Sequence, residues 1–287
     1  MASKTSDITR RTARVIHYTL SYLVQGEEYG PAGAVVLLHD IPAGAFTWKG
    51  IMPQLAGLKR AVYAVDMLGY GHSDHPWPAD TSPWGQADAL LFLLQQLKLT
   101  DVILVGHGLG GVVAQILATR LYREHTAALV LINTLCYQHA FAADWPLPEM
   151  EKRQDYDAPR QTQVADLMRD LRETLPAAVQ NTKDFAKVIN EYLNQWNSEL
   201  GKEVLYQHIR LLIPSYVNSV SSDLKVLGKP VLLIWSEQNR VVPLKYAERL
   251  HREIPDSQLV TIPDAGHLVL FDAPAAVAQA ITSFVRS

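Results

Sequence analysis

The stretch from Val105 to Gly111 reads VGHGLGG and continues the apolar run DVILV, which begins at Asp101. A short apolar run that ends in glycines predicts a buried strand, a tight turn and a helix that begins near Leu109. The spacing matches the Gly-x-Ser-x-Gly turn, in which a serine sits on a strained link between strand and helix. The central residue here is Gly108, which has no side chain and cannot act as a nucleophile.

Similar apolar runs lie on both sides of this stretch. They are Ala34–Asp40, Ala61–Asp66, Ala127–Asn133, Pro230–Trp235 and Ser257–Ile262. Continuous apolar runs are typical of strands covered on both faces. Helical apolar stripes, such as Trp84–Leu94 and Ala273–Phe284, separate them. This alternation predicts a parallel, doubly wound sheet, and the alternating pattern of Ala13–Glu27 predicts an antiparallel edge hairpin.

The alternation of strands and helices stops between Leu135 and Lys229. Apolar residues there repeat only with helical spacing, as in Val164–Leu175 and Phe185–Leu193. We therefore expect a helical cap over residues 135–225, inserted into a core made of residues 1–134 and 226–287.

Composition narrows the class of protein. The chain has 287 residues, is 48% hydrophobic and carries a net charge of −3, so nothing favours nucleic-acid binding. No run approaches the roughly 20 apolar residues of a membrane span, and the opening MASKTSDITRRTARVIHY lacks the apolar run of a signal peptide. The single cysteine, Cys136, excludes an internal disulfide and a cysteine-based metal cluster. We expect a cytoplasmic protein, monomer or homodimer, that acts on a small molecule without a metal, a cofactor or a membrane partner.

Four landmarks follow one another in a recognisable order. They are LLHDIPAGAFTW (Leu37–Trp48), VDMLGYGHSD (Val65–Asp74), GHGLGG (Gly106–Gly111), and the late pair IWSEQNRVVP (Ile234–Pro243) and IPDAGHLVLFDAP (Ile262–Pro274). Together they resemble the α/β-hydrolase superfamily, in particular its capped members such as hydroxynitrile lyases, dehalogenases and esterases. The resemblance implies a mostly parallel eight-stranded sheet with helices on both faces and an inserted helical cap.

The chain departs from the family pattern at the positions that carry the chemistry. The resemblance puts the nucleophile at Gly108, the acid at Asn239 and the base at His267. Some family members move the acid to the end of the sixth strand, where this chain has Asn133, another amide. An amide can accept a hydrogen bond from an imidazole but cannot stabilise its cation, and the equivalent Asp→Asn change in a serine protease costs roughly 10⁴ in rate.

Asp40 stands where this superfamily usually has a glycine. In hydroxynitrile lyases the same position carries a hydroxyl residue that faces the substrate, so the resemblance implies that Asp40 projects into the pocket. The alternative is a loop aspartate that caps nearby backbone amides. The resemblance also implies an oxyanion hole made by the backbone N–H groups of Ile41 and Leu109. The candidate substrate-binding residues are His107, Trp48, Asn133 and Cys136.

Three functions remain open. The first is a non-covalent acid/base enzyme, a lyase, isomerase, cyclase or water-adding enzyme, that uses His267, Asp40 and the oxyanion hole on a small apolar substrate. The second is a ligand-binding pseudoenzyme. The third is a serine hydrolase that was deliberately disarmed or redesigned at Gly108 and Asn239.

Overall fold

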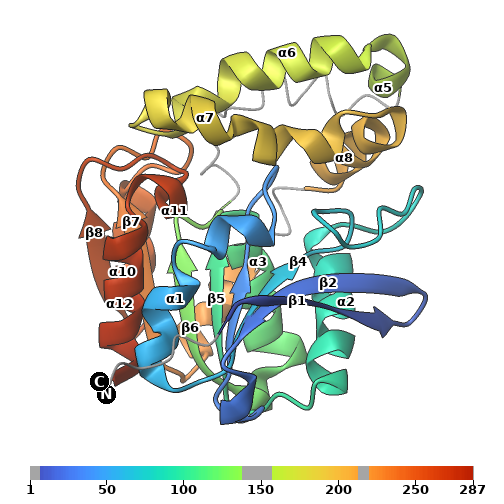
Figure 1. The fold of residues 1–287 in the computed structure, drawn as a ribbon. Helices are drawn as coiled ribbons and strands as arrows, with labels where there is room; N and C mark the ends of the chain where they lie inside the picture. The colour runs from blue at the N-terminus through green and yellow to red at the C-terminus, as the bar shows by residue number, and fades with distance from the viewer. Residues whose placement is uncertain (1–6, 138–156, 213–219, 287) are drawn as a thin grey trace.

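The computed structural model describes residues 7–137, 157–212 and 220–286. Its centre is one eight-stranded sheet with the strand order β1-β2-β4-β3-β5-β6-β7-β8 (Figure 1). The strands are β1 Thr9–Val15, β2 Tyr18–Gln25, β3 Val35–Leu38, β4 Val62–Asp66, β5 Val102–His107, β6 Thr126–Ile132, β7 Val231–Ser236 and β8 Gln258–Ile262. The first two strands pair antiparallel with each other, β2 pairs antiparallel with β4, and the remaining pairs are parallel.

The predicted fold class is confirmed, because each predicted apolar run contains a strand and the intervening stripes form helices. The helices are α1 Met52–Leu55, α2 Pro83–Gln96, α3 Leu109–Ile116, α5 Ala158–Gln161, α6 Val164–Thr174, α7 Thr182–Leu193, α8 Glu199–Leu211, α10 Lys245–Glu253, α11 Val269–Asp272 and α12 Pro274–Arg286. Two hydrophobic clusters cover the two faces of the sheet. One includes side chains of α2, α3 and α10, and the other includes side chains of α1 and α12.

Helices α5 to α8 form a separate layer above the sheet (Figure 1). This layer lies over the carboxyl ends of the parallel strands, because Gln195, which follows α7, donates from Nε2 to the carbonyls of Pro42 (2.7 Å) and Ala43 (2.9 Å) in the loop after β3. The amide of Leu268, after β8, likewise donates to the Ala178 carbonyl at 2.9 Å. Residues 138–156 and 213–219 of the expected cap lie outside the described residues, and the division of the chain at 135 and 225 stays a prediction.

Candidate active site

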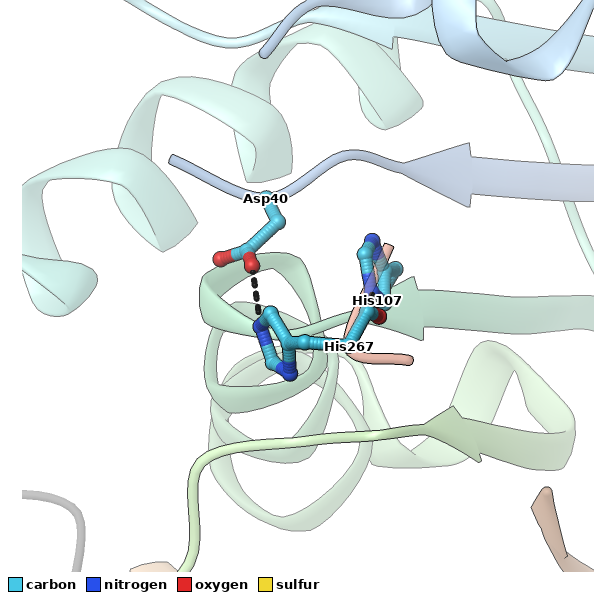
Figure 2. A group of neighbouring side chains, drawn as sticks. All are labelled: Asp40, His107 and His267. Atoms are coloured by element: carbon cyan, nitrogen blue, oxygen red, sulfur yellow. Dashed lines mark hydrogen bonds and ion pairs between the residues drawn. The ribbon is translucent and has the colours of Figure 1, made fainter. Parts of the chain in front are cut away.

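The candidate residues lie in loops that follow four parallel strands. Asp40 follows β3, Gly108 follows β5, Asn239 follows β7 and His267 follows β8. The carboxyl ends of parallel strands meet at one edge of a sheet, which is where open α/β sheets bind ligands. Residues far apart in sequence therefore come together at this edge, and Figure 2 shows the Asp40 carboxylate pointing at the His267 ring.

Asp40 is completely buried and bonded at both carboxylate oxygens. Its Oδ2 lies 2.8 Å from Nε2 of His267, and its Oδ1 accepts a hydrogen bond of 2.7 Å from the Leu109 amide at the start of α3. Burial opposes ionisation of the carboxyl, but the hydrogen bond and the charge of His267, with smaller contributions from His107 and Leu109, outweigh it. The pKa of Asp40 is therefore lowered. Asp40 faces the site and does not merely cap its own loop.

Gly108 makes room for this carboxylate. Its backbone has φ +52° and ψ −115°, a conformation that residues with a side chain adopt only under strain. A Cβ atom built on Gly108 would lie 2.1 Å from Cγ of Asp40 and 2.2 Å from each carboxylate oxygen. Real Cβ atoms essentially never come this close to another heavy atom. The Asp40 carboxylate therefore occupies the space in which a side chain at position 108 would begin.

Asn239 contacts the other side of the His267 ring. Its Oδ1 lies 3.2 Å from Nδ1 of His267, and the same oxygen accepts 3.0 Å hydrogen bonds from the amides of Val241 and Val242. Asn239 therefore lies where the acid was expected, with an amide oxygen against the imidazole. Its Nδ2 is buried and has no hydrogen-bond partner among the described residues.

The predicted oxyanion-hole donors lie beside Asp40. The Leu109 amide donates to Asp40 itself, so a substrate oxygen could use this donor only after the carboxylate moved. Ile41 is buried in the loop directly after Asp40. The oxyanion hole stays a prediction, and in the structure one of its two predicted donors is bonded to the Asp40 carboxylate.

His107, a predicted substrate-binding residue, belongs to the same cluster, although its substrate contact stays a prediction. Its Nε2 donates a 2.8 Å hydrogen bond to the His267 carbonyl, and the two rings lie 5.2 Å apart. Burial is the main reason that the pKa of His107 is lowered to about 4, and the ring is therefore neutral at neutral pH. One ligand atom from each of Asp40, His107 and His267 lies within 4.8 Å of the others, and imidazole and carboxylate groups are common metal ligands. The hydrogen bonds already described account for the same cluster without an ion.

Asn133 supports the loop that carries His267. Its Nδ2 donates to the His267 carbonyl and to Ser236 Oγ, both at 2.9 Å, and its Oδ1 accepts from the Ser236 amide at 2.9 Å. A carboxylate could not donate these bonds. The amide of Asn133 therefore holds the His267 loop in place through the His267 carbonyl and through Ser236.

Two other predicted substrate-binding residues are buried in the hydrophobic clusters. Trp48 is fully buried in the cluster on the α1 and α12 face, at the end of the 3-10 turn Ala45–Trp48. Cys136 is buried in the other cluster, and burial raises the pKa of its thiol far above the ordinary value. Neither side chain is placed for chemistry with His267, and a substrate contact for either stays a prediction.

Tyr70 is a neighbour of the site that the sequence analysis did not single out. Its ring is stacked on His208 at 4.1 Å and meets the edge of His39 at 4.9 Å. Burial, and then the negative charge of Asp40, raise the pKa of the phenol well above its ordinary value. The hydroxyl has no hydrogen-bond partner among the described residues. Tyr70 belongs to the glycine-rich segment VDMLGYGHSD, and this was the only indication in the sequence that the residue lies near the site.

Comparison with known proteins identifies the family. The family model described as alpha/beta hydrolase fold matches residues 33–274. The chain belongs to this family. Among curated relatives, an uncharacterized hydrolase, YugF, of Bacillus subtilis is 22% identical over 88% of this chain and 89% of its own length. The 2-hydroxy-6-oxo-2,4-heptadienoate hydrolase of Pseudomonas putida is 24% identical over 91% of each chain.

Solved structures agree on the fold. The haloalkane dehalogenase DbeA of Bradyrhizobium elkani superposes with a TM-score of 0.85 at 20% identity, covering 98% of both chains. An alpha/beta hydrolase fold protein of Burkholderia ambifaria has a TM-score of 0.83 at 24% identity, covering 97% of this chain and 98% of its own. Within the described residues, no helix is both long and apolar enough to cross a membrane.

Proposed function

We propose that this alpha/beta hydrolase fold protein is an enzyme that transfers protons without forming a covalent intermediate. The observation that carries the proposal is the buried contact of 2.8 Å between Asp40 Oδ2 and His267 Nε2, directly over Gly108. A carboxylate and an imidazole in contact can take a proton from one atom of a substrate and deliver one to another. That chemistry suits a lyase, an isomerase, a cyclase or an enzyme that adds water.

The usual serine mechanism does not fit this chain. Loss of the serine alone costs roughly 10⁶ in rate in a comparable triad enzyme, and Gly108 offers no atom that could attack. The Leu109 amide, which would stabilise the oxyanion of an acyl-transfer reaction, is already bonded to Asp40. Proton transfer needs neither group, and a positioned acid or base contributes about 10²–10⁴ in rate.

The substrate that we propose is small and largely apolar. Ile41 follows Asp40 in the sequence and Leu109 follows Gly108. The Leu135 amide donates to the Gly108 carbonyl at 3.4 Å. All three residues belong to the apolar cluster on this side of the sheet. A dry setting of this kind strengthens electrostatic interactions with the reacting atoms.

The contact over Gly108 disfavours the third alternative, a hydrolase disarmed by two substitutions. A serine restored at position 108 would collide with Asp40, so the parent would also have needed a different residue at position 40. Gly108 and Asp40 fit each other as a pair, which supports a site arranged around Asp40.

The ring opening of nitrobenzisoxazole tests the proposal. A base removes the ring C–H proton, the N–O bond breaks, and a nitrile and a coloured phenolate form. We expect the wild-type protein to accelerate this reaction, and we expect Asp40→Asn and His267→Ala to lower the rate by about a hundredfold or more. The matched control is His251→Ala, which removes a histidine of α10 that contacts Ser257. If His267→Ala and wild type react at the same rate, the proposal fails, and ligand binding without turnover becomes the better account.

A further inference from the structure

The His267 ring has a carboxylate on one nitrogen and an amide on the other. Asp40 Oδ2 lies 2.8 Å from Nε2, and Asn239 Oδ1 lies 3.2 Å from Nδ1. We propose that Asp40 takes over the role of the acid from the opposite side of the ring, and that Asn239 is a positioning residue that keeps Nδ1 protonated without adding a second charge. This inference rests on the proposed function, because it explains how the pair exchanges its proton.

The orientation of the Asn239 amide decides which ring nitrogen carries hydrogen. The atom that faces His267 also accepts from the amides of Val241 and Val242. An NH₂ group has no lone pair to accept these bonds, so this atom is the oxygen. The neighbouring Nδ1 must therefore be the donor, and His267 carries a hydrogen on Nδ1.

The contact on the other side of the ring then holds one proton. At 2.8 Å, Nε2 and Oδ2 must share a hydrogen, which belongs either to the imidazole or to the carboxyl. The second oxygen, Oδ1, accepts from the Leu109 amide and carries none. The pair of Asp40 and His267 is thus neutral in both arrangements. In the ionic arrangement it offers a carboxylate as the base and an imidazolium as the acid.

A carboxylate at position 239 would disturb this balance. The ring would lie between two anions, which would hold the imidazolium and leave a net negative charge in a buried site. Near Asp40, the phenols of Tyr70 and Tyr192 and the imidazole of His39 are neutral, because burial raises the pKa of the phenols and lowers that of the imidazole. Two further titratable groups face this loop. The neutral ring of His107 lies 5.2 Å away, and the Asp272 carboxylate accepts from the Gly266 amide at 2.8 Å. Neither contributes a charge that would compensate for a second carboxylate. An opposite charge at hydrogen-bond distance shifts the pKa of a titratable group by about 1–3 units in the direction that favours its charged form.

The test adds a carboxylate on the Nδ1 side of the His267 ring and, in a double variant, also removes the carboxylate on the Nε2 side. Asn239→Asp has the same shape as the native residue and keeps the acceptor for Val241 and Val242. We expect the midpoint of the His267 ring titration, followed by NMR of the imidazole, to rise by about 1–3 pH units in this variant. Turnover of nitrobenzisoxazole should fall by about tenfold to a thousandfold, because the proton leaves the ring less readily. In the double variant Asp40→Asn, Asn239→Asp, the midpoint should return toward the wild-type value, whereas turnover should stay low because Asp40 is absent.

Two results would overturn the inference. One is an unchanged titration midpoint in Asn239→Asp, and the other is a wild-type ring without hydrogen on Nδ1, a measurement that needs no variant. Failure of the proposed function looks different. The ring would then titrate as described, while wild type would not accelerate the ring opening.

Discussion

Filling the space over Gly108 tests whether this glycine and Asp40 form one structural unit. The change is Gly108→Ala, which adds a single Cβ atom 2.1 Å from Cγ of Asp40. Two costs follow. A side chain at φ +52° carries backbone strain of about 1–3 kcal/mol, and overpacking against Asp40 costs about another 1–3 kcal/mol. We therefore expect a loss of about 2–6 kcal/mol in the free energy of unfolding, measured by urea titration.

A control separates the two costs. Gly228 also has a positive φ, of +66°, but a Cβ atom there would meet nothing within 4 Å. Gly228→Ala should therefore show only the backbone strain, about 1–3 kcal/mol.

The decisive measurement is a double-mutant cycle with Asp40→Gly. Without the Asp40 side chain, the new Cβ atom at position 108 has room, so Gly108→Ala should cost about 1–3 kcal/mol less in the Asp40→Gly background than in wild type. Costs that add to within about 0.5 kcal/mol would refute the coupling. In that case Asp40 would move aside easily, and its position over Gly108 would carry no functional argument.

The remaining predictions use the same site. The double variant Gly108→Ser, Asn239→Asp should show no burst with an activated ester while Asp40 is present, because a serine side chain at position 108 would need the space that Asp40 occupies; a stopped-flow burst would contradict this. Burial lowers the pKa of His107 to about 4, against about 6.5 in the unfolded chain. The unfolded chain binds the proton first, so about 3 kcal/mol of stability is lost as pH falls from about 6.5 to 4; His107→Gln, which can keep the donor to the His267 carbonyl, should flatten this part of a plot of urea midpoint against pH. Dialysis against a chelator should leave nitrobenzisoxazole turnover unchanged, because a shared proton already satisfies Asp40 and His267; a loss of rate that one divalent metal restores would assign an ion to the cluster.

The fold could be predicted from the sequence because its signals are local. Each buried strand is a continuous apolar run, such as Asp101–Gly106, and the glycines that follow it mark the turn into α3. Placement of His267 and Asn239 was also possible, because both lie in loops directly after strands and parallel strands bring such loops to one edge. The order of strands and loops therefore predicted that Asn239 and His267 lie near Gly108 at one edge of the sheet.

The direction of each side chain could not be predicted. A loop aspartate such as Asp40 can bond to its own backbone or turn inward, and both arrangements leave the same sequence. Trp48 is a second example. It was predicted to bind the substrate, and the structure buries it in the hydrophobic cluster on the α1 and α12 face, so a substrate contact stays a prediction. The convergence of His107 with Asp40 and His267 depends on the last residue of β5 meeting two loops in space, which no spacing within one segment reveals.

The three unusual residues of the site are better explained as one coupled change than as separate losses. Asp40 can lie beside Nε2 of His267 only when position 108 lacks a side chain. Once Asp40 is there, an acid at position 239 would place the imidazole between two buried carboxylates, whereas Asn239 keeps the hydrogen bond and leaves the site neutral. Independent decay would not be expected to match these choices, since a buried charge left without its partner costs about 3–5 kcal/mol. Each of the three residues removes a conflict that another would create, which supports the proposal that the site retains a function.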